Sequence, residues 1–239
     1  MQRRPEFARI RAELARSMHF RALAPEDLDR LTELCRLRRL RDGQRLSGVG
    51  EHLNELWIVL HGALRLSTTT ASGEEFIYAM LGRGSFYGLA HLIDGLNTIA
   101  EACAYGPTEL AVVDGTGFLR LLDERPQLWR HVVRILTRRL GLAMSVIRDL
   151  SVAPLEQRIA RRLLGQALSS GLDVGGPSAV ELRLTQSDLG RMLGASRSKV
   201  NATLKHFERQ GLVKVGYRTI KLDDLAGLRG IAGSDVFAF

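Results

Sequence analysis

The sequence of 239 residues is poor in cysteine and has no apolar run long enough to cross a membrane. Its two cysteines, Cys35 and Cys103, are too few for a disulfide scaffold, a four-cysteine zinc site or an iron–sulfur cluster held by one chain. The first residues, MQRRPEFARIRAEL, are basic and amphipathic and lack the apolar segment of a secretory signal. We therefore expect a cytoplasmic protein with free thiols and no membrane partner.

Catalytic signatures are missing as well. The sequence contains no HExxH motif, no GxSxG elbow, no P-loop and no paired carboxylates on a strand–loop frame. We expect no enzymatic activity, no metal site and no cofactor. The alternative is an enzyme built on the glycine-rich part of the chain, which a polar, convergent cleft there would indicate.

Acidic residues are scarce in one stretch near the C-terminus. Between residues 191 and 221 eight residues are basic, and Glu208 is the one acid. The whole chain carries a formal charge of +8. Such an excess of positive charge favours a polyanionic partner, above all nucleic acid.

The same stretch contains a helix-turn-helix pattern. Thr185 and Asp188, three residues apart, have the spacing of a capping box at the start of a helix with one apolar face. Gly194 then predicts a tight turn, because glycine accepts the positive φ that such a turn requires.

A second helix is predicted directly after this turn. Ser196 can cap it, and Val200, Leu204 and Phe207 recur at intervals of four and three. One face can therefore join a core while the polar face enters a groove of DNA. The segment GLVKVGYRTIKL predicts a β-hairpin, the wing beside the two helices. We favour binding of double-stranded DNA over the alternatives, a plain helical hairpin or a structural dimer that has lost DNA binding.

The first half of the chain has two different sequence patterns. Residues 6 to 39 are expected to be helical, because their apolar residues have helical spacing. From Leu40 to Val113, short apolar runs alternate with glycines, which predicts the strands of a small barrel or roll. Gly62 inside one run predicts a bulge or a tight corner. Thr116 to Leu122 is expected to be a short helix.

One long helix is predicted between Pro126 and Pro154. Its apolar residues follow a 3-4-3-4-3 pattern, typical of a helix that pairs with a copy of itself. This dimer seam consists of Val133, Leu136, Leu140, Ala143, Ile147 and Leu150. A second apolar edge is expected to lie on the roll: Val132, Ile135, Leu142 and Val146. We expect a homodimer; the alternative is a buried helix without a dimer.

The order of these parts, together with three segments, resembles the cyclic-AMP receptor protein family, the Crp–Fnr transcription regulators, over about residues 15 to 225. The segments are GEHLNELWIVLHGALRL, LGRGSFYG and LTQSDLGRMLGASRSKVNATLKHFERQGLV. The resemblance implies an α+β protein with a cyclic-nucleotide-binding-like β-roll (1–125), a dimerisation helix (126–152) and a winged helix-turn-helix domain (153–239). It implies a homodimeric, sequence-specific activator or repressor, whose roll senses a signal and which works with RNA polymerase.

The resemblance also assigns the DNA contacts. Arg197, Ser198 and Ala202 fall where the family reads base edges, and Arg197 matches the family's recurrent arginine, whose fork can reach guanine O6 and N7. Asn201 and Lys205 lie on the same polar face. Positions expected to contact phosphates are Gln186, Ser187, Ser196, Lys199, Tyr217 and Arg218.

The implied effector pocket departs from the family pattern. Its positions are Gly88, Leu89, Ala90, His91, Thr98, Ile99, Arg139, Ala143 and Met144. In cyclic-nucleotide binders of the family, a glutamate stands at the position of Leu89. An Arg-Ser pair stands at the positions of Thr98 and Ile99 if one residue is deleted, and a Thr-Ser pair stands at the positions of Ala143 and Met144. A cyclic phosphate needs charge-assisted partners, so we do not expect cyclic AMP to be the effector, whose identity stays open.

Two further regulatory interpretations are weaker. His91 stands near the axial histidine of a haem-sensing branch of the family, but one histidine without a second ligand is a weak signal. A hydrogen-bonded or exposed histidine is favoured. A redox switch at Cys103 is not favoured either, because no neighbour in the sequence is basic enough to lower the pKa of its thiol. A regulator without an effector, or one that responds to haem or redox state, stays the alternative.

Overall fold

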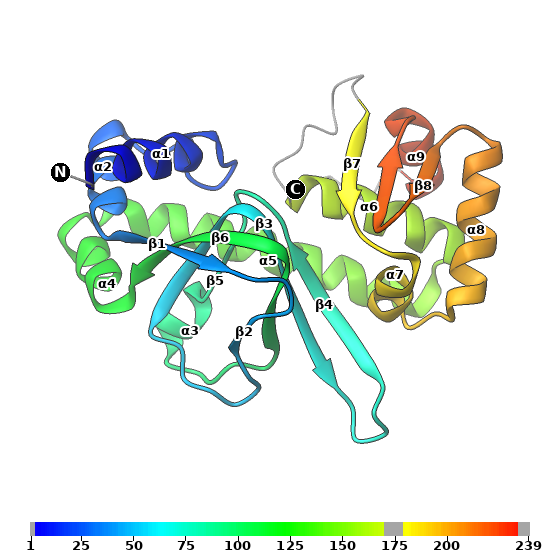
Figure 1. Ribbon diagram of the computed structural model, residues 1–239, viewed down its shortest axis with the longest axis horizontal. Coiled ribbons are helices and arrows are strands. Elements are labelled where there is room, and N and C mark those ends of the chain that lie inside the picture. Colours follow the sequence, from blue (N-terminus) through cyan, green and yellow to red (C-terminus); the bar gives the residue numbers. More distant parts are fainter. Residues whose placement is uncertain (1–2, 170–178, 234–239) are drawn as a thin grey trace. The chain divides into compact units, whose positions relative to one another are not determined.

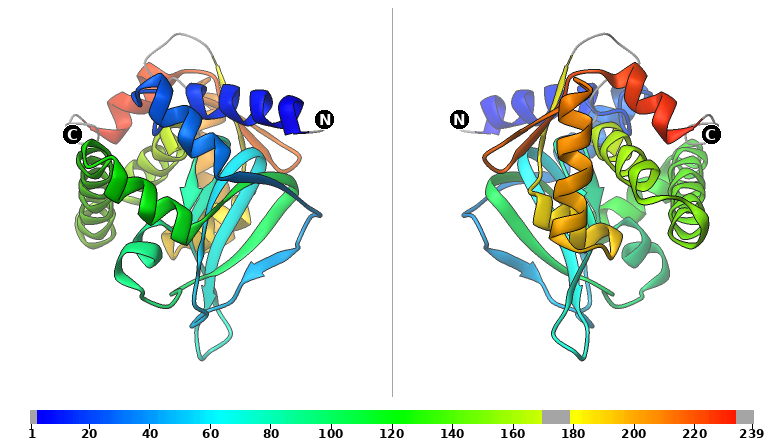
Figure 2. Two further views of the ribbon diagram at one scale, coloured as in Figure 1. Left: turned by 90° about the vertical axis from the view of Figure 1, so that its left-hand side faces the viewer. Right: turned by 90° about the vertical axis from the view of Figure 1, so that its right-hand side faces the viewer.

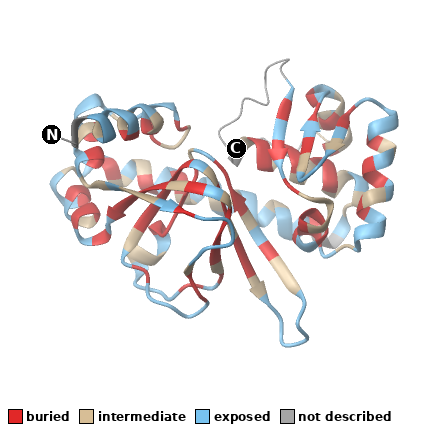
Figure 3. Ribbon diagram, in the orientation of Figure 1, coloured by how far each residue is buried: buried red, intermediate tan, exposed pale blue. Residues whose placement is uncertain are grey.

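The computed structural model describes residues 3–169 and 179–233, and the chain divides into two compact units. The first unit comprises residues 1–68 and 78–136, and the second comprises 69–77 and 137–239. Within each unit the buried residues gather where sheets and helices face one another (Figure 3).

The first unit is an antiparallel sheet with helices packed on one of its faces (Figure 1). Its strands run in the order β1-β6-β3-β4, while β2 also pairs with β6 and β5 pairs with β3. The strands are β1 (Cys35–Leu40), β2 (Arg45–Ser47), β3 (Glu55–Thr69), β4 (Glu75–Leu81), β5 (Phe86–Tyr87) and β6 (Glu101–Asp114). The helices are α1 (Arg3–Arg16), α2 (Pro25–Glu33), α3 (Leu89–Asp94), α4 (Gly115–Glu124) and the first part of α5 (Gln127–Val152).

The helical expectation for residues 6 to 39 is wrong at residues 17–24, which form turns between α1 and α2, and at its C-terminal end. Helix α2 ends at Glu33, and Cys35–Leu40 forms β1, whose residues pair one to one with Thr108–Val113 of β6. In a run this short, the apolar residues fit the spacing of a helix as well as the alternation of a strand. Pairing with a long neighbouring strand decides the outcome, because it satisfies the backbone groups of the segment.

Gly62 lies at a bulge, one of the two alternatives predicted for it. Its φ is 77°, and the register between β3 and β6 shifts between Val59 and His61 and again between His61 and Ala63. A Cβ at Gly62 would lie 2.5 Å from the carbonyl oxygen of Pro107, so no other residue fits without movement.

This bulge changes which residues of β3 face each core. Before it, Trp57 and Val59 belong to the strand core, a cluster of buried residues supplied by strands and their loops alone. After it, Leu64 and Leu66 belong to that core, so the parity has changed from odd to even. Strand side chains alternate with period two, and one irregularity therefore moves every later side chain to the other face. Leu56, Ile58 and Leu60 join the helix core, between the sheet and the helices.

The second unit holds the rest of α5 and a small three-stranded sheet surrounded by helices. Its elements are α6 (Leu155–Ser169), β7 (Val180–Arg183), α7 (Gln186–Leu193), α8 (Arg197–Arg209), β8 (Val213–Gly216), β9 (Thr219–Leu222) and α9 (Leu225–Ala232). The sheet is antiparallel in the order β7-β9-β8. The helices α4 and α5 agree with the sequence-based expectation, whereas β7 and α9 were not predicted.

Candidate nucleic-acid interface

Helix α7 begins at the capping box that the sequence predicted. The Thr185 hydroxyl accepts a hydrogen bond from the Asp188 amide (3.0 Å), and the Asp188 carboxylate accepts one from the Thr185 amide (3.1 Å). The helix ends at Gly194, whose φ of 59° is left-handed, as the tight turn requires. These two local signals fix the length of α7 and the direction in which the next helix leaves.

Gly190, inside α7, contacts this turn, and sequence reasoning missed it. A Cβ at this position would lie 2.7 Å from the Ala195 carbonyl oxygen, and the Ala195 amide donates to the Gly190 carbonyl (3.0 Å). The backbones of α7 and of the turn therefore meet at Gly190. A glycine inside a helix, where it costs stability, was the available signal.

Helix α8 separates cleanly into a buried and an exposed face. Ser196 caps it by accepting a hydrogen bond from the Lys199 amide (3.4 Å). Val200, Leu204 and Phe207 are fully buried, as predicted, and Thr203 joins them. The helix lies at the surface of the second unit (Figure 2, right view).

The exposed face of α8 carries most of the residues predicted to contact DNA. The exposed residues are Arg197, Ser198, Lys199, Ala202 and Lys205, and Asn201 is half-buried. Gln186 and Ser187 are half-buried at the start of α7. This is an exposed polar and basic surface on a helix that a hydrophobic core holds from behind.

The wing follows α8 directly and packs against it. Residue pairs from Val213↔Leu222 to Gly216↔Thr219 join β8 and β9, and their turn consists of Tyr217, 92% exposed, and Arg218, whose φ is 55°. The carboxylate of Glu208 accepts a hydrogen bond from the Val215 amide (2.8 Å). The one acid of the basic stretch therefore serves to hold the wing beside α8.

Several of the predicted effector positions in the first unit have structural roles. Leu89 opens α3 and is buried in the helix core, whereas Ala90 is exposed. Gly88, with a φ of 110°, approaches the Glu55 carbonyl so closely that a Cβ would lie 2.4 Å from it. Arg139, Ala143 and Met144 belong to the second unit, where Ala143 and Met144 are exposed on α5.

Thr98 and Ile99 have opposite environments. Thr98 is buried, its hydroxyl donates to the Glu51 carbonyl (3.1 Å), and its backbone exchanges hydrogen bonds with Gly50 and Glu51. Ile99 is 67% exposed. The side chain and the backbone of Thr98 thus join two loops of the roll.

His91 is hydrogen-bonded through both ring nitrogens. Nδ1 lies 3.1 Å from the Leu96 carbonyl oxygen, and Nε2 lies 3.2 Å from the Tyr87 hydroxyl. Both nitrogens are thus engaged within the chain, as the favoured interpretation of this histidine expected. In the described residues no three side chains of the His, Cys, Asp or Glu types come together as metal ligands would.

Both thiols have a raised pKa. Burial raises the pKa of Cys35 to about 12. Burial, then the hydrogen bond to Glu101 and the charge of that carboxylate, raise the pKa of Cys103 to about 11. The thiolate is the reactive form, so these environments make both cysteines poor redox sensors.

The predicted dimer seam is exposed along α5. Val133 is 57% exposed, Leu140 63% and Ile147 58%, Ala143 is exposed too, and Leu136 is partly buried against the helix core. The side chain of Leu150 lies outside the described residues. The second apolar edge divides: Val132 and Ile135 are buried in the helix core as expected, but Leu142 and Val146 are exposed, because they lie beyond the part of α5 that packs on this core.

Comparison with known proteins agrees with this architecture. Residues 37–125 match the cyclic nucleotide-binding domain, and residues 157–231 match the Crp-like helix-turn-helix domain. A search of the described helices finds none long and apolar enough to span a bilayer.

Two relatives match almost from end to end. The cyclic AMP receptor protein of Thermus thermophilus is 30% identical over 213 residues, 89% of this chain and 95% of the relative. A CRP-like cAMP-activated global transcriptional regulator of Mycobacterium tuberculosis is 24% identical over 88% of this chain and 94% of the relative. Among solved structures, FixK2 of Bradyrhizobium japonicum shares the fold with a TM-score of 0.72 at 22% identity, covering 84% of this chain and 98% of FixK2.

Proposed function

The chain belongs to the Crp–Fnr family of transcription regulators and carries that family's helix-turn-helix DNA-binding domain, and we propose that it acts as a homodimer on a two-fold symmetric site in double-stranded DNA. Its relatives are regulators, and it is likewise not an enzyme. The observation that carries the proposal is the division of α8 into a fully buried apolar face and an exposed basic one.

The exposed face of α8 suits the major groove in shape and charge. The groove is about 12 Å wide and admits one α-helix. Arg197 leads the helix, where its planar fork can bond guanine O6 and N7, while Ser198, Asn201, Ala202 and Lys205 follow on the same face. The Lys199 ammonium, the wing turn and the start of α7 would contact phosphates, which position the helix without reading bases.

The exposed seam of α5 supports the homodimer. Apolar residues spaced as in a coiled coil, with side chains more than half exposed, are stabilised when a second copy covers them. Two copies would place their α8 helices in successive major grooves, about 34 Å apart.

Cyclic AMP is not the effector in this proposal, although relatives are named for it. The family's glutamate position, Leu89, is buried in the helix core, and the hydroxyl of Thr98 is engaged by the Glu51 carbonyl. Neither of these two positions therefore offers the charge-assisted partner that a cyclic phosphate needs.

By its family the protein would work in the cytoplasm with RNA polymerase as a further partner. The division into a sensor (1–125), a dimerisation helix (126–152) and a DNA-binding domain (153–239) belongs to the same proposal.

Selection of DNA from a random duplex pool at low salt tests the proposal. We expect enrichment of a two-fold symmetric sequence that the protein retards in a gel. Retardation without enrichment would contradict sequence-specific binding. No retardation would leave only a structural dimer and contradict the function itself.

A further inference from the structure

We propose that the protein has an effector site outside the strand core, in an apolar cavity between the helices and the sheet of the first unit, and that it takes a small uncharged molecule with one hydrogen-bond donor. The inference rests on the proposed function, because an effector has meaning only for a protein that binds DNA.

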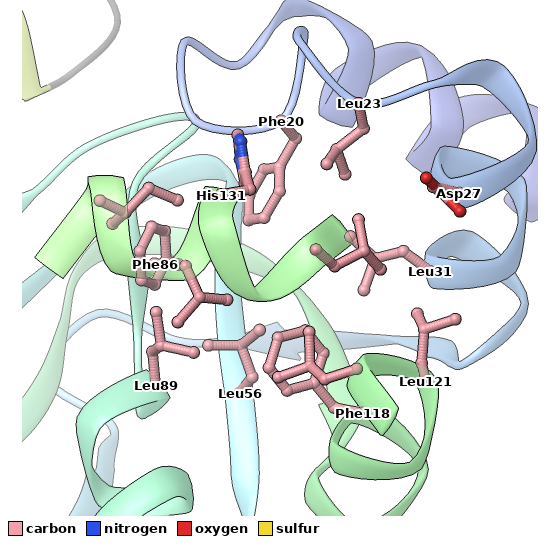
Figure 4. A pocket seen from close by; sticks show the side chains of 14 residues that line it. Phe20, Leu23, Asp27, Leu31, Leu56, Phe86, Leu89, Phe118, Leu121 and His131 are labelled. Carbon is pink, nitrogen blue, oxygen red and sulfur yellow. The ribbon is translucent and has the colours of Figure 1, made fainter. Parts of the chain in front are cut away.

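The cavity has a volume of about 30 Å³ and is lined by residues from helices, from strands and from the segment between α1 and α2 (Figure 4). Phe20 and Leu23 come from that segment, Leu31 from α2, and Val132 and Ile135 from α5. All but two of the lining side chains are apolar. A water molecule needs two to four polar partners, so the site favours an apolar occupant over water.

Asp27 supplies the polar recognition element. Its side chain is 5% exposed, and within the described part of the chain its Oδ1 atom has no hydrogen-bond donor. The Arg125 guanidinium lies 3.7 Å from Oδ1, beyond hydrogen-bond distance, and the Gln127 amide donates to Oδ2 at 3.5 Å. A buried acceptor left without a donor costs free energy, and a donor on a ligand would satisfy it.

The segment that covers the cavity has neither helix nor strand. Residues 17–24 form turns, and the Ser17 hydroxyl holds them to the turn between β4 and β5 by donating to the Gly84 carbonyl (2.7 Å). His131 of α5, the second polar lining residue, hydrogen-bonds the His19 carbonyl. Rotation of Phe20 and Leu23 can therefore widen the cavity for a molecule of a few carbon atoms without unfolding a regular element.

Occupancy of the cavity would act on the dimer through α5. Val132 and Ile135 line the cavity, and Val133, between them, points outward with 57% of its surface exposed. Leu136 belongs to the seam and packs on the helix core as well. A ligand that moves this wall therefore changes the position of the first turns of the seam, and a dimer that docks two helices on DNA is sensitive to that geometry.

Methyl NMR of the full-length protein tests the site with two probes, xenon and 1-propanol. We expect shifts at Leu31 and Ile135, and none at Leu64 in the strand core, which serves as the internal control. A molecule as small as 1-propanol is limited to a Kd of about 40 µM or weaker. Shifts confined to Leu64, or no shifts at all, would overturn the site.

Variants distinguish the contribution of the cavity to probe binding from that of the Asp27 carboxyl group. Leu31→Phe fills the cavity and should abolish the binding of both probes, whereas Leu31→Met conserves its volume and should preserve it. Phe118→Leu enlarges the cavity and should strengthen xenon binding, which keeps the test decisive if Leu31→Phe does not fold. Asp27→Leu should weaken 1-propanol about tenfold and leave xenon unchanged, since only the alcohol donates a hydrogen bond. An equal loss for both probes would contradict the role of Oδ1.

The effector role is tested on DNA. Saturating 1-propanol should change the affinity for the selected duplex in the wild-type protein and not in Leu31→Phe. Binding in the cavity without any change in DNA affinity would overturn the effector role. Failure of the proposed function is a distinct result, because the protein would then bind no DNA with or without 1-propanol.

Discussion

At the scale of single residues, glycines and charged side chains decide how this protein folds and reads DNA. Gly62, Gly190 and Gly194 each hold a backbone conformation or a close approach that a Cβ would disfavour. The neighbouring side chains Arg197 and Lys199 have different roles in the proposed complex. These differences give predictions at single positions.

Arg197→Ala should reduce the affinity for the selected duplex by about 1–3 kcal/mol and relax the preference at one base pair per half-site. A salt titration on selected and scrambled duplexes measures both effects.

Lys199→Ala, the matched variant on the same exposed face, should weaken both duplexes about equally. It should also reduce the magnitude of the slope of log affinity against log salt concentration by about one unit, because one phosphate no longer has an ammonium partner. Should Lys199→Ala change base preference while Arg197→Ala weakens both duplexes alike, the two roles are reversed.

Gly62→Ala should destabilise the first unit by about 1–3 kcal/mol, because the new Cβ meets backbone at 2.5 Å and φ is 77°. Urea unfolding measures this change. The control is Gly165→Ala within α6, where a Cβ has no atom within 4 Å. It should stabilise by about 0.5–1 kcal/mol, because alanine is the better helix former. Equal effects of the two variants would contradict the bulge argument.

At the scale of elements, α5 has two roles along its length. Its first turns complete the helix core through Val132 and Ile135, and its next turns present an exposed apolar seam. Helix α8 has a similar division, between a packed and an open face. In both helices the open surface is the one that the proposed function requires.

Leu140→Lys should convert the dimer to a monomer at micromolar concentration, because it brings like charges together across an apolar interface. Sedimentation velocity detects the change. Leu142→Lys places the same side chain on the same helix, on the other edge, at a residue that is 45% exposed, and should remain dimeric. Dissociation of both variants, or of neither, would show that the seam is assigned to the wrong face.

At the scale of the whole molecule, residues 37–125 match the cyclic nucleotide-binding domain, and we propose that the pocket positions differ chemically from those of cyclic-nucleotide binders. Leu89 and Ile99 place alkyl groups at two of these positions. The net charge of +8 adds an attraction for DNA that needs no effector.

Calorimetry should therefore detect no micromolar affinity for cyclic AMP, and the nucleotide should not alter the binding of the selected duplex. The receptor protein of Thermus thermophilus, measured in the same way, is the comparison. Micromolar heats of binding to this chain would contradict our assignment of the pocket.

The sequence by itself determined the elements whose signals are local. The caps at Thr185 and Ser196, the turn at Gly194 and the buried face of α8 depend on residues within a few helical turns of each other, and all were predicted correctly. The sequence also indicated the irregularity at Gly62, because a glycine inside a strand often marks a bulge or a tight bend.

Only the tertiary structure decided the features that depend on distant partners. Residues 35–39 became a strand because β6, which is far away in the sequence, pairs with them. Residues 180–183 form β7 because they pair with β9. Leu142 and Val146 are exposed because the helix core ends before them along α5. The cavity beside Asp27 collects side chains from residues 20 to 135, and no short sequence pattern records how they pack. Local hydrogen bonds are encoded within a few residues, whereas packing is a property of surfaces that meet only in the folded chain.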